Sequence, residues 1–483
     1  MRRVALTTIV CLAAACAGPP ASPAAPEGRS IELVPLQDTN PDPDIVEVTL
    51  VAGPARKEIL SGKLANVWAY RDGSIPGSAP SLPGPLLEVK RGDRVIVHLR
   101  NELEEGTTVH FHGLRLPEAM DGAHGIVLPG ETFESSFIAG DAGTFWYHPH
   151  FDADVQMERG LYGAMHVRED APSRTAGERI LVLDDIKLAP GGELAGAWTE
   201  ADIAHGRVGN VLLVNGVPAA VDPSSSNPDL ALVTPPVLHG VAGSRERWHL
   251  VNAANGRFYK LTVPGHPFEV IGWDGGLIAQ PYKSDTLLIA PGERYDVLVS
   301  LAASPGDALE LRMLPHDHGD GVPLSSAHAL LGIELTAGLS LDAAPDHTGA
   351  IQALPVDGAT KVRSFALGED LHGKYGPLFF INGEIWPFNK PIDATLGDLE
   401  IWEIKNEAEG SHPFHLHGMF FQVLSRGGVP EDRLGWKDTV LVGPKSSVRF
   451  AVRYDAPGIW MYHCQIPEHA ERGMMGEVMV AAP

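Results

Sequence analysis

Apolar and polar residues alternate in short runs along most of the chain, and Gly and Pro stand at the ends of many of these runs. Alternation with a period of two places the apolar side chains on one face of a β-strand, and Gly and Pro are typical of the turns between strands. With 53 Gly and 40 Pro among 483 residues, the pattern predicts a loop-rich, all-β protein rather than a helical one.

One continuous apolar stretch, Val4 to Ala15, departs from the alternation. It follows the basic start Met1-Arg2-Arg3 and leads through small residues to Cys16, which is the pattern of an export signal. The stretch is shorter than the about 20 residues that span a bilayer. We therefore predict a signal peptide over residues 1–16, a flexible tether over 17–30, and an extracytoplasmic location, periplasmic or attached to the cell envelope. The residues before Cys16 also resemble a lipoprotein cleavage box, which leaves a lipid anchor at Cys16 and simple release as alternatives.

A spacing frame occurs three times in the sequence. A Gly is followed nine residues later by Asn and nine residues after that by the first residue of a pair: Gly92, Asn101 and His110; Gly243, Asn252 and Leu261; Gly397, Asn406 and His415. The three Gly are 151 and 154 residues apart, which indicates three homologous domains, each long enough for a β-sandwich. The middle copy carries aliphatic residues in place of histidines, which predicts a domain without metal.

Domain boundaries are expected in two stretches, the polar residues 171–178 and the residues 337–360. We accordingly predict a first domain over residues 31–172, a second over 173–340 and a third over 341–483.

The charge balance excludes one class of partner. The chain has 61 Asp and Glu against 37 Lys and Arg, for a net charge of −24, so nucleic acid is not an expected partner. The 44% hydrophobic content is ordinary for a globular protein, which excludes a wholly disordered chain.

Histidine placement points to metal chemistry. Random placement of the 21 His predicts about one His-x-His pair, but the sequence contains four: His110/His112, His148/His150, His316/His318 and His415/His417. Residues i and i+2 of a strand face the same way, so each pair offers two imidazoles side by side, as a multinuclear site of copper, zinc or iron requires. We expect His316 and His318, in a polar loop of the middle domain, to be surface residues instead.

Cys464 stands beside His463 near the C-terminus. Adjacent strand residues face opposite ways, so His463 can face a domain interface while Cys464 faces the interior of its own domain. A buried core cysteine is the ordinary alternative. His412, Cys464 and His469, with Met474 as a weak axial ligand, would form the His₂Cys and Met set of a blue-copper centre.

These motifs, in this order, resemble the multicopper oxidases, specifically the three-domain, laccase-like bacterial members, over about residues 45–483. The resemblance implies three consecutive cupredoxin-like Greek-key β-sandwich domains and up to four copper ions. It assigns type 1 copper to His412, Cys464, His469 and Met474, type 2 copper to His110 and His415, one type 3 ion to His150, His417 and His463, and the other type 3 ion to His112, His148 and Gln465.

Two positions depart from the family pattern. Gln465 replaces a histidine, and its amide oxygen is a weaker donor than imidazole, so one type 3 ion is in doubt. The family also uses two acids to supply protons for dioxygen reduction. Asp121 matches the first as a catalytic residue, but Ala470 stands at the second, where Glu468 or Glu471 is the alternative.

The expected function is an exported copper oxidase that couples one-electron oxidation of phenols, aromatic amines or metal ions to the reduction of dioxygen to water. Its partners would be a small-molecule or metal-ion electron donor and dioxygen. The ten Met are scattered rather than gathered in an insertion, which favours organic donors. Two alternatives are a non-catalytic exported copper-binding or scaffold protein of the same fold, motivated by Gln465 and Ala470, and a copper nitrite reductase.

Overall fold

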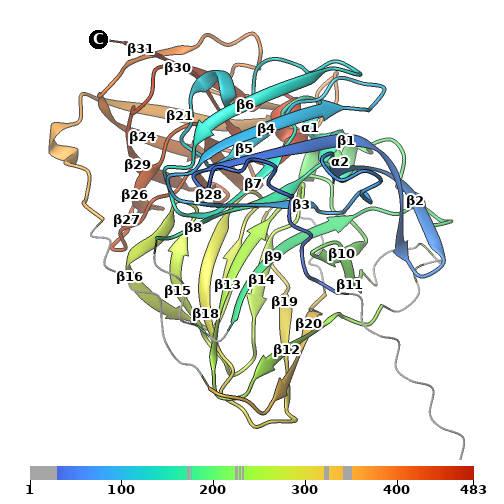
Figure 1. Ribbon diagram of the computed structural model, residues 1–483. Helices are drawn as coiled ribbons and strands as arrows, with labels where there is room; N and C mark the ends of the chain where they lie inside the picture. Colours follow the sequence, from blue (N-terminus) through green and yellow to red (C-terminus); the bar gives the residue numbers. More distant parts are fainter. Residues whose placement is uncertain are drawn as a thin grey trace, which may run out of the picture.

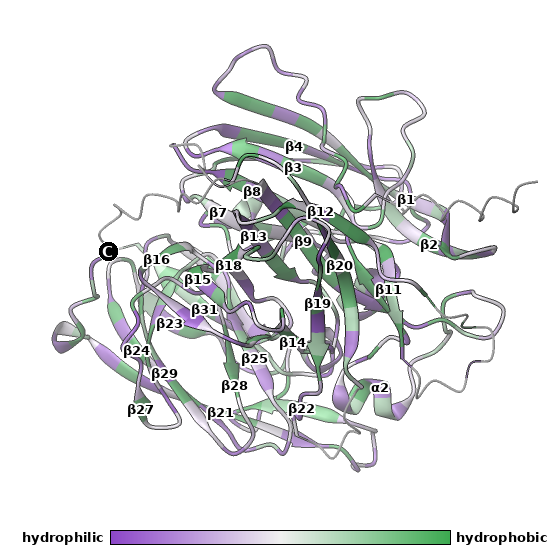
Figure 2. Ribbon diagram, turned by 90° about the horizontal axis from the view of Figure 1, so that it is seen from below, coloured by the Kyte–Doolittle hydropathy of each residue, from purple (hydrophilic) through white to green (hydrophobic). Residues whose placement is uncertain are grey.

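The computed structural model describes residues 30–170, 175, 177–222, 227, 230, 233–319, 326–340 and 351–482. The predicted signal peptide, Cys16 and all but the last residue of the tether lie outside these residues. The regular structure of the described chain consists almost entirely of strands, which form six sheets, and the strands in Figure 2 carry alternating hydrophobic and hydrophilic residues along their length. The predicted all-β fold class is confirmed.

The first β-sandwich packs two four-stranded sheets around one apolar core. One sheet has the order β2-β1-β4-β6, with β1 Ile45–Leu60, β2 Lys63–Asp72, β4 Arg94–Asn101 and β6 Thr132–Ile138. The other has the order β3-β8-β7-β5, with β3 Gly84–Lys90, β5 His110–His112, β7 Gly143–His148 and β8 Gly163–Arg168.

The middle sandwich has the largest sheet. Its seven strands have the order β11-β10-β9-β13-β18-β15-β16, with β9 Gly177–Ile186, β10 Val211–Val214, β11 Val217–Val221, β13 Arg245–Asn252, β15 Phe268–Trp273, β16 Gly276–Ser284 and β18 Arg294–Ser300. The five-stranded sheet has the order β12-β20-β19-β14-β17, with β12 Val237–Val241, β14 Tyr259–Thr262, β17 Leu287–Ile289, β19 Ala308–Leu314 and β20 His328–Thr336.

The third sandwich contains the C-terminal strands. Its six-stranded sheet has the order β22-β21-β24-β29-β26-β27, with β21 Lys361–Asp370, β22 Leu378–Ile381, β24 Leu399–Asn406, β26 Phe421–Arg426, β27 Val429–Pro430 and β29 Ser447–Arg453. The five-stranded sheet has the order β23-β31-β30-β25-β28, with β23 Ile392–Thr395, β25 His412–Leu416, β28 Thr439–Val442, β30 Gly458–Cys464 and β31 Met475–Ala481.

Helices are few and short in the described residues. The α-helices are α1 Ala153–Glu158, α2 Glu200–His205 and α3 Pro467–Glu471, and the 3-10 helices are η1 Glu118–Met120 and η2 Val356–Gly358. Helix α3 contacts both α1 and α2, so one helix from each sandwich lies at a common junction. None of the helices in the described part of the chain is long and apolar enough to cross a membrane.

The repeated Gly and Asn of the sequence frame have a structural cause. Gly92, Gly243 and Gly397 all have positive φ, and each turns the chain into the strand that ends at the repeated Asn. In every copy that Asn donates from Nδ2 to at least two backbone carbonyls and accepts at Oδ1 from the amide two residues further on. Asn252, for example, donates from Nδ2 to the carbonyls of Arg257 and Ile289 at 2.8 and 3.0 Å and accepts from the amide of Ala254 at 3.0 Å.

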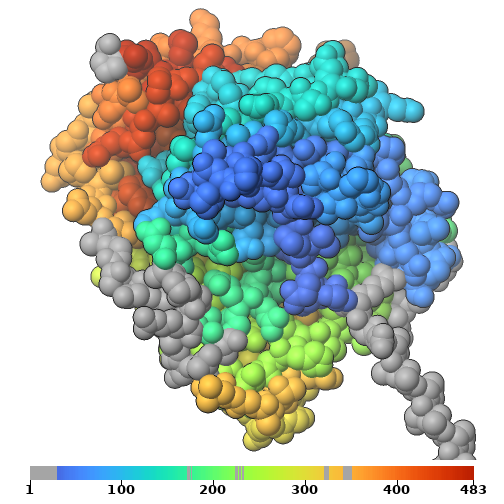
Figure 3. Space-filling view, viewed as in Figure 1, coloured from blue at the N-terminus to red at the C-terminus, as the bar shows by residue number. Residues whose placement is uncertain are grey.

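The first and third sandwiches meet side by side, and the middle sandwich lies beneath both. Figure 1 shows the blue and cyan strands of the first sandwich against the red strands of the third, with the green and yellow strands below, and the same contact is visible on the surface in Figure 3. Strands β5 and β25, which carry the paired histidines, lie near this contact. The chain passes from one sandwich to the next between β8 and β9 and between β20 and β21, and the exact domain boundaries stay a prediction.

Candidate metal centre

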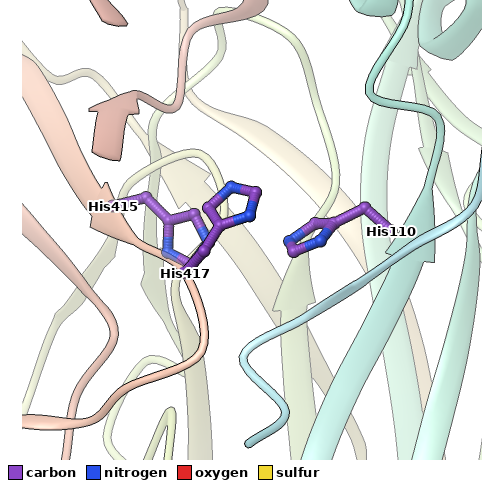
Figure 4. A group of neighbouring side chains, drawn as sticks. All are labelled: His110, His415 and His417. Atoms are coloured by element: carbon purple, nitrogen blue, oxygen red, sulfur yellow. The ribbon is translucent and has the colours of Figure 1, made fainter. Parts of the chain in front are cut away.

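Histidines from the two outer sandwiches meet at their contact. His110, from β5, faces His415 and His417, from β25 and the turn that follows it (Figure 4). The rings of His110 and His417 stack with their centroids 4.0 Å apart and 22° between their planes. The donor nitrogens of these three residues lie within 4.8 Å of one another, which is close enough for a single metal ion to bind all three.

All seven predicted cluster histidines gather there. Two further groups share the same spacing of donor nitrogens, namely His110, His112 and His148, and His150, His417 and His463. His110 pairs with His148 across β5 and β7, and His415 pairs with His463 across β25 and β30. The antiparallel pairing of two strands in each outer sandwich therefore aligns the imidazoles that the sequence spacing predicts.

The outer nitrogens of most cluster rings are held by the protein. The Nδ1–H groups of His110, His148 and His463 donate to the carbonyls of Asp121, Pro149 and Cys464 at 2.8, 2.9 and 2.8 Å. The Nδ1–H of His417 donates to Asp121 Oδ2 at 2.8 Å. Because Nδ1 carries the proton, Nε2 presents a lone pair to the interior of the cluster.

The inward nitrogens fit a metal. Nε2 of His110, His148 and His415 is buried and has no hydrogen-bond partner, a costly state for a buried polar atom unless a ligand satisfies it. Burial first of all, and the neighbouring imidazoles, hold the pKa of His148 well below its usual range. A neutral imidazole is the form that binds copper or zinc.

His112 is turned the other way. Its Nε2–H donates to Asp438 Oδ1 at 3.1 Å, while Nδ1 is the buried atom without a partner. Burial would raise the pKa of Asp438, but the charge and hydrogen bonds of Arg294 outweigh it and hold that pKa well below its usual range. An ionised Asp438 accepts hydrogen bonds and keeps the proton of His112 on Nε2.

The second donor group lies inside the third sandwich. Cys464 Sγ lies 3.6 Å from His412 Nδ1 and 3.7 Å from His469 Nδ1, and the two nitrogens are 3.2 Å apart. Phe379 stacks on His469 with ring centroids 4.0 Å apart. Met474 is fully buried, and its carbonyl accepts from the amide of Cys464 at 3.0 Å. These side chains belong to or border the apolar core of the sandwich.

This group also fits a metal better than a plain core cysteine. Burial raises the pKa of the Cys464 thiol, so the thiolate needs a cation beside it to form. Two imidazole nitrogens converge on the sulfur from β25 and α3. Because His463 and Cys464 are consecutive residues of β30 and face opposite ways, one peptide link joins this group to the histidine cluster.

The family model of the multicopper oxidases matches the chain in three segments, residues 66–172, 193–307 and 360–483. The chain belongs to the multicopper oxidase family. The three matched segments lie in the three sandwiches, which are the cupredoxin-like domains of this family, and the family implies copper as the bound metal and oxidoreductase activity.

Relatives of this multicopper oxidase are described by different names. The multicopper oxidase MmcO of Mycobacterium tuberculosis is 29% identical, with coverage of 95% of this chain and 92% of the relative. The laccase of Bacillus subtilis is 26% identical, with coverage of 83% and 89%. The solved structure of a Campylobacter jejuni multicopper oxidase, described as a metallo-oxidase, has a TM-score of 0.79 at 26% identity and covers 93% of this chain and 94% of that one.

Gln465 departs from the other predicted donors. It is buried, and its Oε1 has no hydrogen-bond partner. A side chain at Gly292 would collide with Gln465 Cγ at 2.5 Å and come within 3.2 Å of His112 Cε1, so both Gln465 and His112 pack against Gly292. The multicopper oxidase thus has a buried amide oxygen without a partner at the residue that the family resemblance assigns, with His112 and His148, to one type 3 ion.

The predicted acids lie around the donor groups rather than among them. Asp121 is buried and contacts His110 and His417 at their outer nitrogens. Ala470 packs against Met461 and Met475 in a small apolar cluster. Glu468 is fully buried and accepts at Oε1 from Trp198 Nε1 and Asn255 Nδ2 at 3.1 and 2.9 Å.

His316 and His318, which were expected to be surface residues, are partly buried. The loop of His316 and His318 is only half exposed, and His318 stacks on Phe258 with ring centroids 5.0 Å apart. Its carbonyl accepts from the amide of Ser411, next to His412.

The sequence reasoning missed Asp438 and Arg294. The four-residue turn Pro291 to Arg294 repeats Pro129-Gly130-Glu131-Thr132 of the first sandwich with Arg in place of Thr, which is the one signal that marks Arg294.

Proposed function

We propose that this multicopper oxidase is an exported, laccase-like enzyme. In the overall reaction, four one-electron donors are each oxidised once, and one dioxygen takes up the four electrons and four protons to give two waters. The donors would be phenols, aromatic amines or metal ions.

The observation that carries this proposal is the junction at His463 and Cys464. These consecutive residues belong to two donor groups of different chemistry, one of imidazoles alone and one of two imidazoles and a thiol. The thiol group with Met474 has the composition of a blue-copper centre, and the paired imidazoles have that of a multinuclear copper cluster. An isolated copper-binding protein would have no need for both groups in one strand.

The residues would hold copper in the family arrangement. His412, Cys464, His469 and Met474 would hold type 1 copper; His110 and His415 type 2; His150, His417 and His463 one type 3 ion; and His112, His148 and Gln465 the other. Copper in these places supplies one-electron oxidation at the thiolate and reduction of dioxygen at the cluster. Burial holds the pKa of His417 well below its usual range, and hydrogen bonds to Asp121 and Asp438 fix the orientation of His417 and His112.

Glu468 is proposed as a proton carrier. It would replace the acid that the family has at the position of Ala470. It is a buried carboxyl one residue before His469, held by the side chains of Trp198 and Asn255. Glu471 is a poorer candidate because it is exposed and accepts from the amide of Ala153 in α1.

The composition of the chain and its relatives both bear on the class of substrate. The scattered methionines favour organic donors, whereas the net charge of −24 would attract cations. The relatives include a laccase and a metallo-oxidase, so both substrate classes belong in the first assays.

A second candidate function is a non-catalytic copper-binding or scaffold protein. Gln465 favours it, since a cluster with a weak third donor at one ion could fail to react with dioxygen. The intact His412, Cys464 and His469 group argues against it, because a chain that had lost its catalytic role would not be expected to keep the thiol site.

Oxygen uptake and the visible spectrum of copper-loaded protein test the two candidates together. With a simple phenol and with cuprous ion as donors, the enzyme should be blue and consume one dioxygen for four electrons. Blue colour without uptake for either donor would establish the non-catalytic alternative, and absence of blue colour would refute the type 1 assignment.

Export and anchoring are part of the same proposal, supported by the pattern of residues 1–16. A mature protein that partitions into detergent, and loses this behaviour in Cys16→Ser, would be lipidated. Partition into the aqueous phase in both forms would mean release, and retention in the cytoplasm with residues 1–16 intact would refute export.

A further inference from the structure

Arg294 is a fully buried cation that contacts all three sandwiches. It opens β18 in the middle sandwich, and its side chain is 1% exposed. Its NH1 and NH2 donate to Asp438 Oδ1 and Oδ2 of the third sandwich at 2.7 and 2.6 Å. Its Nε donates to the carbonyl of Thr144, in β7 of the first sandwich, at 3.1 Å. A paired, two-pronged bond of this kind fixes the plane of a carboxylate as well as its position.

Further bonds fix Arg294 itself. Its NH2 donates to the carbonyl of Asp274 at 3.0 Å and its NH1 to the carbonyl of Gly292 at 3.1 Å. The backbone amide of Arg294 donates to Asp274 Oδ1 at 2.9 Å. The guanidinium is therefore held rigidly by the middle sandwich, and the loop of Gly292 brings it directly beneath the histidine cluster.

Asp438, held in place by Arg294, accepts hydrogen bonds from two imidazoles. Its Oδ1 accepts from His112 Nε2–H at 3.1 Å, and its backbone carbonyl accepts from His415 Nδ1–H at 3.0 Å. The hydroxyl of Thr439 donates to the same Oδ1 at 2.8 Å. The Oδ1 atom thus has Arg294 on one side and His112 on the other.

The orientation of His112 is unusual within the cluster. Where the contacts define the inward atom of a cluster ring, it is Nε2 for the other histidines, whose Nδ1 bonds to nearby backbone or to Asp121. Nδ1 is the inward atom of His112, because its Nε2 lies 3.1 Å from Asp438 Oδ1 and 3.0 Å from the hydroxyl of Thr439, residues 326 and 327 positions away in the sequence. No local backbone carbonyl sets this ring, so its orientation depends on the third sandwich.

We propose that Arg294 is a positioning residue of the copper cluster, which fixes Asp438 and thereby holds His112 with Nδ1 facing the type 3 site. The inference rests on the proposed function, since it needs a cluster to position. It gives the middle sandwich, which supplies none of the predicted ligands, a role beyond that of a spacer. Lysine at this place would keep the charge but has no planar fork to hold both oxygens of Asp438.

The first experiment compares Arg294→Lys with Arg247→Lys. Arg247 is a matched control because it is also 1% exposed and ties the middle sandwich to Glu169, which follows β8 of the first, through two bonds of 2.8 Å, but it contacts no predicted ligand. Each copper-loaded variant is measured for copper per chain, for blue absorbance, for copper visible by electron paramagnetic resonance, and for melting temperature.

Arg294→Lys should keep the blue absorbance while the affinity for the most weakly held copper falls about 10- to 100-fold, the usual cost of losing a group that orients a metal ligand. The two type 3 copper ions, whose spins are coupled, should also become visible in the electron paramagnetic resonance spectrum of Arg294→Lys. Arg247→Lys should lower the melting temperature without either change. Equal copper content and spectra in the two variants, or equal loss of both copper centres, would overturn the proposal and leave Arg294 a purely structural tie.

A second measurement needs neither copper nor a variant at Arg294. In the copper-free wild-type protein with ¹⁵N-labelled histidines, nuclear magnetic resonance reports which ring nitrogen carries the proton, and His112→Gln assigns the signal. His112 should be protonated at Nε2, and Asp438→Asn should shift this population toward Nδ1. A wild-type His112 protonated at Nδ1, or no change in Asp438→Asn, would refute the inference. Failure of the proposed function is separate, because wild-type protein would then bind no copper cluster at all.

Discussion

His110 and His417 stack face to face across the contact of the first and third sandwiches, with ring centroids 4.0 Å apart. Asp121 holds both rings, His110 through its backbone carbonyl and His417 through its carboxylate. One residue thus fixes a donor from each sandwich, so the packing of the two sandwiches and the geometry of the cluster depend on the same contacts.

Asp121→Asn should separate the role of Asp121 in orienting the cluster histidines from the binding of copper. The amide keeps the size of the carboxylate but removes its charge, and it can turn an N–H toward His417 Nδ1. We expect turnover to fall about 10- to 100-fold, with the blue absorbance unchanged because the thiol group lies elsewhere. Steady-state oxidation of a phenol, with copper content measured on the same sample, checks this. Turnover equal to wild type would show that neither a proton nor an orienting role belongs to Asp121.

Gln465→His should strengthen the weakest donor set. An imidazole replaces an amide oxygen at a side chain that, like His112, packs against Gly292. Copper per chain should rise, and oxygen uptake should increase by several-fold if this ion limits the reaction. Gln465→Ala, which removes the oxygen without adding a donor, is the matched control and should lose copper. If copper content and turnover are the same in all three proteins, Gln465 does not limit the cluster.

Asn252→Ala should destabilise the fold without touching the metal chemistry. The change removes three hydrogen bonds and leaves buried carbonyls without donors, at a cost of about 2–4 kcal/mol in the free energy of unfolding. Denaturant unfolding of the copper-free protein measures it. Asn40→Ala, which removes a partly exposed bond to Glu47 and an exposed bond from the amide of Asp42, should change the free energy by no more than about 0.5 kcal/mol. A similar small change at Asn252 would show that the repeated Asn has no role in stability.

The pH dependence of stability should report a buried histidine of the middle sandwich. His249 Nδ1 lies 2.6 Å from Asp296 Oδ1 and Nε2 lies 2.8 Å from Glu178 Oε1. Burial opposes the charged ring, but the Asp296 carboxylate and the hydrogen bonds outweigh it and raise the pKa of His249 above its usual value. The folded state therefore holds a proton that the unfolded state releases near pH 6.5, so this stabilisation is present below that pH and lost as pH rises through the folded pKa.

His249→Gln should flatten this decline in the free energy of unfolding, measured in urea from pH 6 upward. His166, with its ring centroid 4.6 Å away, is the control. Burial and the neighbouring His249 lower the pKa of His166 to about 3, so His166→Gln should leave the slope above pH 6 unchanged. A slope that survives in His249→Gln would assign it to other groups.

The site could be predicted from the sequence to the extent that its donors are local. His110 and His112, like His415 and His417, are paired by the two-residue period of a strand, and the frame ending at Asn101 or Asn406 places each pair at the same point of a repeated sandwich. The dipeptide His463-Cys464 is local in the same sense.

The groups that orient the donors could not be predicted in this way. Arg294 and Asp438 are 144 residues apart, and neither belongs to a motif with metal-ligand spacing. Arg294 lies in the middle sandwich. Its copy of the Gly-Asn spacing frame has aliphatic residues in place of the paired histidines, so the sequence gives no sign of metal chemistry there. Their pairing depends on how three sandwiches pack, which no short-range pattern records.

Because the cluster draws its donors from the first and third sandwiches, they are not all present until late in synthesis of the chain. His110 is synthesised more than 300 residues before His417, and His463 and Cys464 lie among the last 21 residues of the chain. A growing chain can complete its first sandwich with His110 and His148 already paired, yet it holds only part of each donor set until β30 has been made. Both donor sets are therefore complete only after β30 has been made, and a protein truncated before β30 would lack donors from both groups together.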